Sequence, residues 1–146
     1  MKLARKYSFD TYGAGRSTIV TLKNSFHGRT METLTATGQD ELHQYFDPFP
    51  PGFRYAAAND LDALKAAIDE TVCAVMMEPV QGEGGVQPLD ADFVHKASEL
   101  CREKDILLIF DEVQTGVGRT GKLYAWEHFG VRPDILTSAK GLGGGL

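Results

Sequence analysis

Two residues near the end of the sequence could do chemistry together. Asp111 closes the apolar run Ile106–Phe110, and Lys140 follows a second apolar stretch, Ile135-Leu136. A carboxylate and an amine that leave neighbouring buried strands can face one cleft. An amine can bond to a carbonyl compound, and a carboxylate can keep a ring nitrogen protonated. The pair therefore indicates a cleft for a cofactor that has both a carbonyl group and a basic ring nitrogen.

The elements that position this pair are predicted by alternating apolar runs and helical patterns, which are typical of an α/β fold with a mostly parallel sheet. Continuously apolar runs at 74–77 and 106–110 indicate strands covered on both faces. The expected strands are 18–22, 53–56, 72–78, 106–111 and 135–138, and the expected helices are 1–9, 61–70, 91–104 and 123–129. Asn59 or Asp60 is expected to cap the second helix and Asp90 the third. The proline-rich segment 47–52 is expected to be a loop.

Size and composition limit the functions that this protein can have. The chain has 146 residues, enough for one domain with a real core, and a formal net charge of −5. The absence of a basic tract argues against nucleic acid as a partner, and no apolar run approaches the roughly 18 residues of a membrane span. Cys73 and Cys101 lie in predicted regular elements without metal-ligand spacing. We expect reduced core thiols, no metal and a cytoplasmic location.

The segment Gly116–Gly121 fits the pattern G-x-G-x-x-G after a strand and, with Lys122, most of a P-loop. Leu123 stands where a P-loop needs a serine or threonine, and the acidic residue of a dinucleotide site is missing about 20 positions later. A flexible loop beside a site is the better interpretation. Nucleotide binding remains the least favoured function.

Two further motifs each allow a structural and a functional interpretation. In the segment 24–30, Phe26 could pack in the core and Arg29 form a surface ion pair. Alternatively, the ring could stack on a flat cofactor, and the guanidinium could bind a carboxylate through two hydrogen bonds. In the segment 78–85, Glu78 and Glu83 lie among glycines and could simply belong to a turn. Their place at the carboxyl end of a strand, where open α/β sheets bind ligands, favours function.

These motifs, in this order and spacing, resemble the class III aminotransferases of fold type I, within them most closely the acetylornithine branch. The resemblance runs from Lys2 to Leu146 and rests on residues 24–30, 78–85, 110–121 and 133–145 taken together. It implies that residues 1–146 are part of a large pyridoxal-phosphate-binding domain, with an N-terminal segment and a C-terminal small domain outside them. The phosphate-binding residues would then lie in those outer segments.

The resemblance also implies a role for each matching residue. Lys140 would bond covalently to pyridoxal phosphate and move the proton of the substrate. Asp111 would hold the ring nitrogen protonated. Phe26 would stack on the ring, Val113 would line its opposite face, and Gln114 would reach its phenolic oxygen.

The remaining motif residues would act on the substrate or support the site. Arg29 would bind the α-carboxylate of the substrate. Glu83 would neutralise a second arginine when a δ-amino substrate is bound and release it for glutamate. Glu78 would support the site from behind.

The implied reaction exchanges an amino group between N-acetylornithine and 2-oxoglutarate in arginine biosynthesis, by a homodimer. The same motifs fit ornithine, succinylornithine, succinyldiaminopimelate and 4-aminobutyrate aminotransferases. A catalytically inactive truncated remnant is the alternative from another class. Because parts of the cofactor pocket are expected outside residues 1–146, we expect the isolated chain to bind the cofactor weakly and to turn over little or no substrate.

Overall fold

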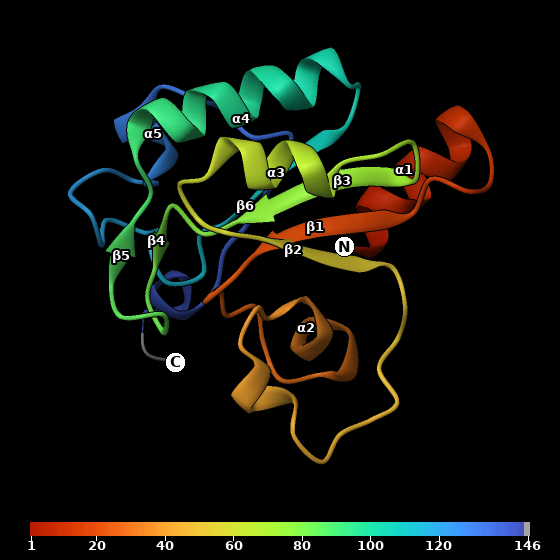
Figure 1. Cartoon of the computed structure of the whole chain (residues 1–146). Coiled ribbons are helices and arrows are strands. Elements are labelled where there is room, and N and C mark those ends of the chain that lie inside the picture. The colour runs from red at the N-terminus through yellow and green to blue at the C-terminus, as the bar shows by residue number, and fades with distance from the viewer. Residues whose placement is uncertain (145–146) are drawn as a thin grey trace.

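The computed structural model describes residues 1–144 and is built on a five-stranded sheet (Figure 1). Its strands are β1 (Thr18–Leu22), β2 (Phe53–Ala56), β3 (Val72–Met77), β6 (Leu107–Asp111) and β7 (Ile135–Thr137). They lie in the order β2-β1-β3-β6-β7, and every neighbouring pair is parallel. The expected α/β fold with a parallel sheet is confirmed.

Helices cover both faces of this sheet. The helices α3 (Leu61–Ala67), α4 (Ala91–Glu103) and α5 (Trp126–Phe129) pack on one face, over strand residues such as Val75 and Phe110. The helix α1 (Lys2–Tyr12) packs on the other face through Ala4, which belongs to a cluster with Ile19 and Ile109. Burial on both faces explains why β3 and β6 are nearly continuous apolar runs.

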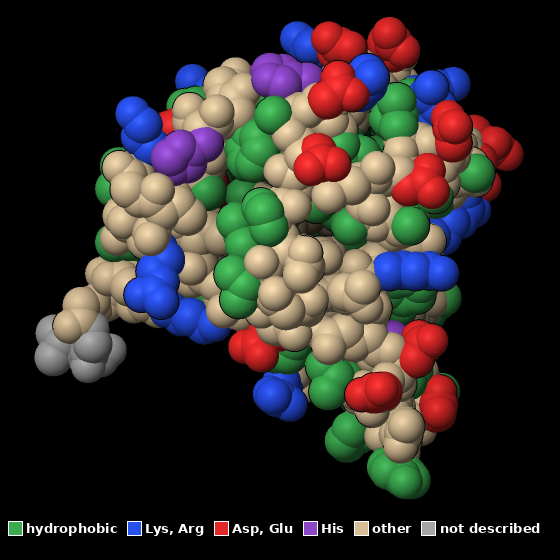
Figure 2. Space-filling view, turned by 60° about the vertical axis from the view of Figure 1, so that its left-hand side comes forward, with side chains coloured by type: hydrophobic (Ala, Val, Ile, Leu, Met, Phe, Trp, Pro, Cys, Tyr) green, Lys and Arg blue, Asp and Glu red, His purple; other side chains and the backbone are tan. Residues whose placement is uncertain are grey.

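Several short elements were not expected from the sequence. They are α2 (Met31–Ala36), the 3₁₀ turns η1 (Asp40–His43) and η2 (Lys140–Gly143), and the two-residue strands β4 (Val80–Gln81) and β5 (Gln87–Pro88), which pair antiparallel. The segment from α2 to the loop before β2 forms a lobe that projects from the sheet and carries hydrophobic side chains at its tip (Figures 1 and 2). Tyr45 in this lobe is 94% exposed.

Most expected boundaries hold to within a few residues. β1 and β2 span the expected residues, whereas β3, β6 and β7 are each one residue shorter, so that Glu78, Ile106 and Ser138 lie just outside them. Asp60 caps α3 by accepting a hydrogen bond from the N–H of Ala63. The expectation that Asp90 caps α4 with its side chain is wrong, because its carboxylate makes no capping hydrogen bond.

Other expectations concern loops, thiols and surface. Residues 47–52 form an irregular loop, as expected. Cys73 and Cys101 form no disulfide and are buried, which agrees with the expected reduced core thiols. On the face in Figure 2, Lys and Arg side chains form several separate groups, some of them beside acidic side chains, instead of one continuous patch. Among the described residues, no helix combines the length and the hydropathy needed to cross a membrane, and no group of three His, Cys, Asp or Glu side chains could hold a metal ion.

Candidate active site

A cavity of about 200 Å³ lies where four parallel strands end. Its walls come from the segments that follow β1, β3, β6 and β7, and the lining residues are Phe26, His27, Gly28, Glu78, Asp111, Val113, Gln114 and Lys140. Six of the eight residues predicted from the sequence are among them. Parallel strands place all their carboxyl ends at one edge of the sheet, which is where open α/β sheets bind ligands.

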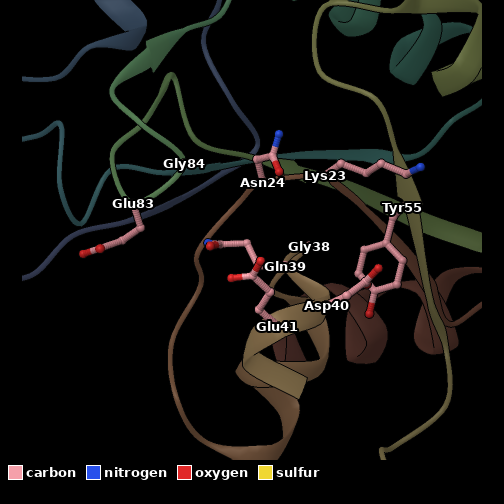
Figure 3. A pocket seen from close by; sticks show the side chains of 9 residues that line it. All are labelled: Lys23, Asn24, Gly38, Gln39, Asp40, Glu41, Tyr55, Glu83 and Gly84. Carbon is pink, nitrogen blue, oxygen red and sulfur yellow. The ribbon is translucent and has the colours of Figure 1, made fainter. Parts of the chain in front are cut away.

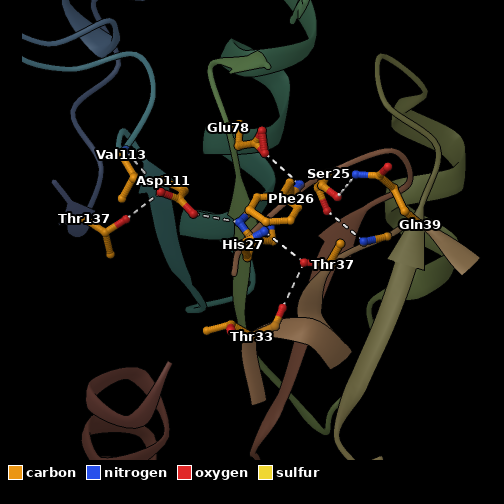
Figure 4. A network of polar contacts seen from close by, with 11 residues as sticks. Ser25, Phe26, His27, Thr33, Thr37, Gln39, Glu78, Asp111, Val113 and Thr137 are labelled. Carbon is orange, nitrogen blue, oxygen red and sulfur yellow. Dashed lines mark hydrogen bonds and ion pairs between the residues drawn. The ribbon is translucent and has the colours of Figure 1, made fainter. Parts of the chain in front are cut away.

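Asp111 is the last residue of β6 and is held by three donors (Figure 4). Its Oδ1 accepts hydrogen bonds from the Thr137 hydroxyl at 2.9 Å and from the Val113 N–H at 3.2 Å. Its Oδ2 lies 2.8 Å from the Nδ1 of His27. Burial by itself would raise the pKa of Asp111, but the hydrogen bond from His27, together with the other two donors, holds this pKa below its usual value. The carboxylate is therefore ionised at neutral pH.

Glu78 follows β3 and behaves in the opposite way. Its side chain is buried, its Oε1 accepts the Phe26 N–H at 2.8 Å, and its Oε2 finds no partner among residues 1–144. Burial raises the pKa of Glu78 to about 7, against the lowering effect of the hydrogen bond from Phe26. The cavity therefore has one carboxylate that is ionised and one that exchanges its proton near neutral pH.

Phe26, in the wall of the cavity, lies in contact with Arg29. The Phe26 ring is half-buried and lines the cavity, and the guanidinium of Arg29 lies over this ring, 5.4 Å from its centre. Arg29 itself is exposed and does not line the cavity. The structure thus places Phe26 in the wall of the cavity and Arg29 over the Phe26 ring, and among the described residues Arg29 forms no ion pair.

Gln114 and Glu83 connect this cavity to a second one. The Nε2 of Gln114 donates to Glu83 at 3.4 Å, and the amide packs against Gly82, where a Cβ would lie 2.8 Å from the Gln114 oxygen. Glu83 does not line the first cavity. It lines a larger one of about 480 Å³ between the β4–β5 hairpin and the lobe (Figure 3), together with Lys23, Asn24, Gly38, Gln39, Asp40, Glu41, Tyr55 and Gly84.

Lys140 begins the 3₁₀ turn η2, three residues after β7 ends. Its backbone is in the left-handed region with φ +48°, which is uncommon for a residue with a side chain. The side chain is exposed and also lines a neighbouring space of about 580 Å³ that includes Val117 and Arg119. Lys140 and Asp111 thus share the wall of one cavity, as the sequence predicted.

The glycine-rich segment 116–121 forms a run of turns and does not open a helix, since α5 begins only at Trp126. The dinucleotide interpretation is thereby disfavoured, because that motif must lead directly into a helix. Glu112, fully buried, organises the loop by accepting the N–H groups of Ala125 and Trp126 at 2.7 and 2.8 Å and the Thr115 hydroxyl at 3.0 Å.

Three functional candidates were missed in the sequence: His27, Thr137 and Glu112. His27 and Glu112 stand next to predicted site residues, but their types alone give no sign of the partners they find. Thr137 is paired directly with Asp111 across β6 and β7. Reading the two strands as parallel neighbours in register could have found it.

Comparisons with known proteins agree with this geometry. A sequence model of the family described as aminotransferase class-III matches residues 1–146. The chain is 55% identical over its whole length to an acetylornithine aminotransferase from Caldanaerobacter subterraneus subsp. tengcongensis, covering 37% of that protein. It is 59% identical over its whole length to a succinylornithine transaminase from Salmonella paratyphi A, covering 36% of it. The chain spans little more than a third of these relatives.

A solved structure gives the same result in three dimensions. The ornithine aminotransferase from Toxoplasma gondii, whose structure is described with partial occupancy of pyridoxal phosphate at its active site, superimposes with a TM-score of 0.92. It is 38% identical in sequence, over 99% of this chain and 35% of that one. The match of family, sequence and fold along the whole length shows that the chain belongs to the class III aminotransferases.

Proposed function

We propose that this chain carries the cofactor-binding centre of a pyridoxal-phosphate-dependent aminotransferase. The observation that supports this proposal most is that Lys140 and Asp111 line one cavity at the carboxyl edge of the sheet. The length of the relatives supports the further proposal that residues 1–146 form part of a larger cofactor-binding domain.

The residues of the cavity fit the chemical groups of pyridoxal phosphate. The amine of Lys140 suits the carbonyl group, and the ionised Asp111 suits a protonated ring nitrogen. A carboxylate has room for about four hydrogen bonds, and Asp111 has received three. The half-buried Phe26 and Val113 provide apolar surface for a flat ring. When bound, the cofactor supplies an electron sink for the substrate carbon that gives up its proton.

Each side chain then has one task. Lys140 would hold the carbonyl group of the cofactor, and its amine would serve as the general acid and base that moves the substrate proton. Asp111 keeps the ring nitrogen protonated. Phe26 and Val113 would hold the ring between them. Gln114 uses one amide hydrogen on Glu83 and has a second to donate to the phenolic oxygen.

Substrate recognition is assigned to the rim of the cavity. Arg29, exposed beside the Phe26 ring, binds the α-carboxylate through two hydrogen bonds. Glu83 lines the larger cavity, accepts a hydrogen bond from Gln114 of the smaller one, and would pair with a second arginine while a δ-amino donor is bound. Glu78 supports the loop that carries Phe26.

We propose N-acetylornithine as the amino donor and 2-oxoglutarate as the acceptor, because the matched relatives include acetylornithine and succinylornithine enzymes. Ornithine, succinylornithine, succinyldiaminopimelate and 4-aminobutyrate are the competing donors. A homodimer in the cytoplasm completes the proposal and rests on the family resemblance alone.

The first experiment mixes the purified protein with pyridoxal phosphate, reduces the mixture with borohydride and identifies the modified residue by mass spectrometry. Modification of Lys140, absent in Lys140→Ala, supports the proposal. The exposed Lys122, changed to alanine, is the matched control and should leave the modification of Lys140 unchanged. Modification spread over several exposed lysines, with none preferred, would contradict it.

The second experiment measures transamination by the protein with any flanking sequence that its gene encodes, using the five donors and 2-oxoglutarate. A kcat/KM for N-acetylornithine at least about tenfold above that for the other donors would support the substrate assignment, since a tenfold ratio corresponds to about 1.4 kcal/mol of transition-state binding. A higher kcat/KM for another donor would make that donor the assigned substrate in place of N-acetylornithine. For the isolated 146-residue polypeptide we expect little or no turnover, and clear turnover would contradict that expectation.

A further inference from the structure

The two oxygens of Asp111 are not equivalent. Oδ1 already accepts two hydrogen bonds, from the hydroxyl of Thr137 and the N–H of Val113. Oδ2 accepts only one, from His27. Each carboxylate oxygen has two lone pairs, so Oδ1 is filled and Oδ2 retains one free acceptor position. A donor that enters the cavity must therefore bond to Oδ2, the oxygen that His27 already contacts.

His27 is held in place from its backbone, and among the described residues its side chain bonds to Asp111 alone. Its backbone N–H donates to the Thr37 hydroxyl at 2.9 Å (Figure 4), its side chain is fully buried, and its Nε2 has no hydrogen-bond partner within residues 1–144. An ionised carboxylate can only accept, so Nδ1 must carry the hydrogen of the contact. Nε2 is then left without a proton, because a buried N–H without a partner would cost more than a bare nitrogen.

We propose that His27 is a positioning residue for the ring nitrogen of the cofactor, and that it acts on Oδ2 of Asp111. In this arrangement one oxygen receives two donors, the Nδ1–H of His27 and the N–H of the ring. The inference rests on the proposed function, because it assigns the ring nitrogen to Asp111. It goes further in naming the oxygen and the residue that controls the basicity of that oxygen.

The proposal predicts that two hydrogen bonds of nearly equal length, from His27 and from Thr137 to Asp111, affect the protonation of the ring nitrogen differently. Without the donor of His27, Oδ2 becomes a stronger base and draws the shared proton away from the ring nitrogen. Without the Thr137 hydroxyl, 2.9 Å from the other oxygen, the effect on Oδ2 is only indirect. Thr137→Val is therefore the matched control, since it removes one donor to the same carboxylate and keeps the shape of the side chain. His27→Asn offers an amide N–H in place of Nδ1–H and should restore the contact that His27→Leu abolishes.

Other titratable groups also lie around His27. Asp111 faces it from β6, Glu78 from the end of β3 and Lys140 from the turn after β7, all on the wall of the same cavity. Because these groups can also change protonation, the variants are compared at one fixed pH. The protein is used with any flanking sequence that its gene encodes.

The decisive measurement is the ¹⁵N NMR shift of the ring nitrogen in protein loaded with ring-labelled pyridoxal phosphate. We expect a protonated ring nitrogen in the unmodified protein and in Thr137→Val, a shift toward the unprotonated value in His27→Leu, and recovery in His27→Asn. The preference for pyridoxal phosphate over an analogue with carbon in place of the ring nitrogen should fall about tenfold in His27→Leu and little in Thr137→Val. Equal effects of His27→Leu and Thr137→Val, or none from either, would overturn the proposal.

A second readout needs no cofactor. In protein labelled with ¹⁵N-histidine, we expect the signals of His27 to show hydrogen on Nδ1 and none on Nε2. This measurement uses the unmodified protein, so it stands even if His27→Leu fails to fold, and hydrogen on Nε2 alone would overturn the proposal. If Asp111→Asn leaves the ring nitrogen as protonated as before, the assigned role of Asp111 fails. If Asp111→Asn removes that proton and His27→Leu does not, only the role of His27 fails.

Discussion

The carboxylate of Glu78 accepts a hydrogen bond from the backbone N–H of Phe26 at 2.8 Å, although the two residues are 52 positions apart in the sequence. The contact joins the end of β3 to the loop after β1 and so holds the Phe26 ring at the cavity. It uses only one oxygen of a buried carboxylate, and the other oxygen has no partner in the described part of the chain. The side chain that fixes the ring is therefore also one whose ionisation is costly.

This relationship predicts a pH dependence of stability. The pKa of Glu78 is raised by burial from 4.5 to about 7 in the folded chain. Between these values the unfolded chain loses the proton while the folded chain keeps it, so the free energy of unfolding falls as pH rises from about 4.5 to about 7 and then levels off. The loss is about 3 kcal/mol at most. Urea unfolding across this range should show the fall, and Glu78→Gln should flatten it. Glu70→Gln, at an exposed position, is the control, and an unchanged slope in Glu78→Gln would refute the prediction.

The loop after β6 should depend on Glu112. Glu112→Ala removes an acceptor from two backbone N–H groups and one hydroxyl, and the buried side chain is replaced by empty space. We expect the free energy of unfolding to fall by about 3 kcal/mol or more. Glu127→Ala is the control, because its exposed carboxylate accepts only the N–H of Tyr124. Equal unfolding midpoints in urea for the two variants would show that the buried acceptor contributes nothing.

Gly38 lies against the end of β1. A Cβ at this position would come within 2.2 Å of the Leu22 carbonyl oxygen, so the backbone of the lobe would have to move away from the sheet. We expect Gly38→Ala to lower the free energy of unfolding by about 1–3 kcal/mol. Gly143→Ala, where a Cβ meets nothing within 4 Å, is the matched control. Thermal unfolding of both variants tests this, and a Gly38→Ala protein as stable as the control would count against it.

The two cysteines should be unreactive while the chain is folded. Both are buried, and burial raises the pKa of both thiols, that of Cys101 to about 12. The thiolate is the reactive form, so alkylation should be slow in buffer and rapid in denaturant. Mass spectrometry after timed iodoacetamide treatment measures this. Rapid labelling of either residue in the folded chain would contradict the burial seen here.

Some elements could be predicted because their causes are local. β1 and β2 were expected at the residues they occupy, since a short apolar run bounded by turn residues is a property of neighbouring residues. The helix α2 was missed because it is short and its threonines favour helices weakly. Its cap is a box in which Thr30 and Thr33 exchange hydrogen bonds, whereas the usual signal has Glu or Gln at the second position.

The sequence by itself determined which residue types are available and which strand each one follows. Because parallel strands end at one edge, this was enough to expect Lys140 and Asp111 at one cavity. Only the tertiary structure decided that His27 contacts Asp111 across 84 positions, and that Oδ2 keeps a free acceptor position. These features depend on which strands lie side by side, and that order follows from how both faces of the whole sheet are buried. Local patterns carry no information about it.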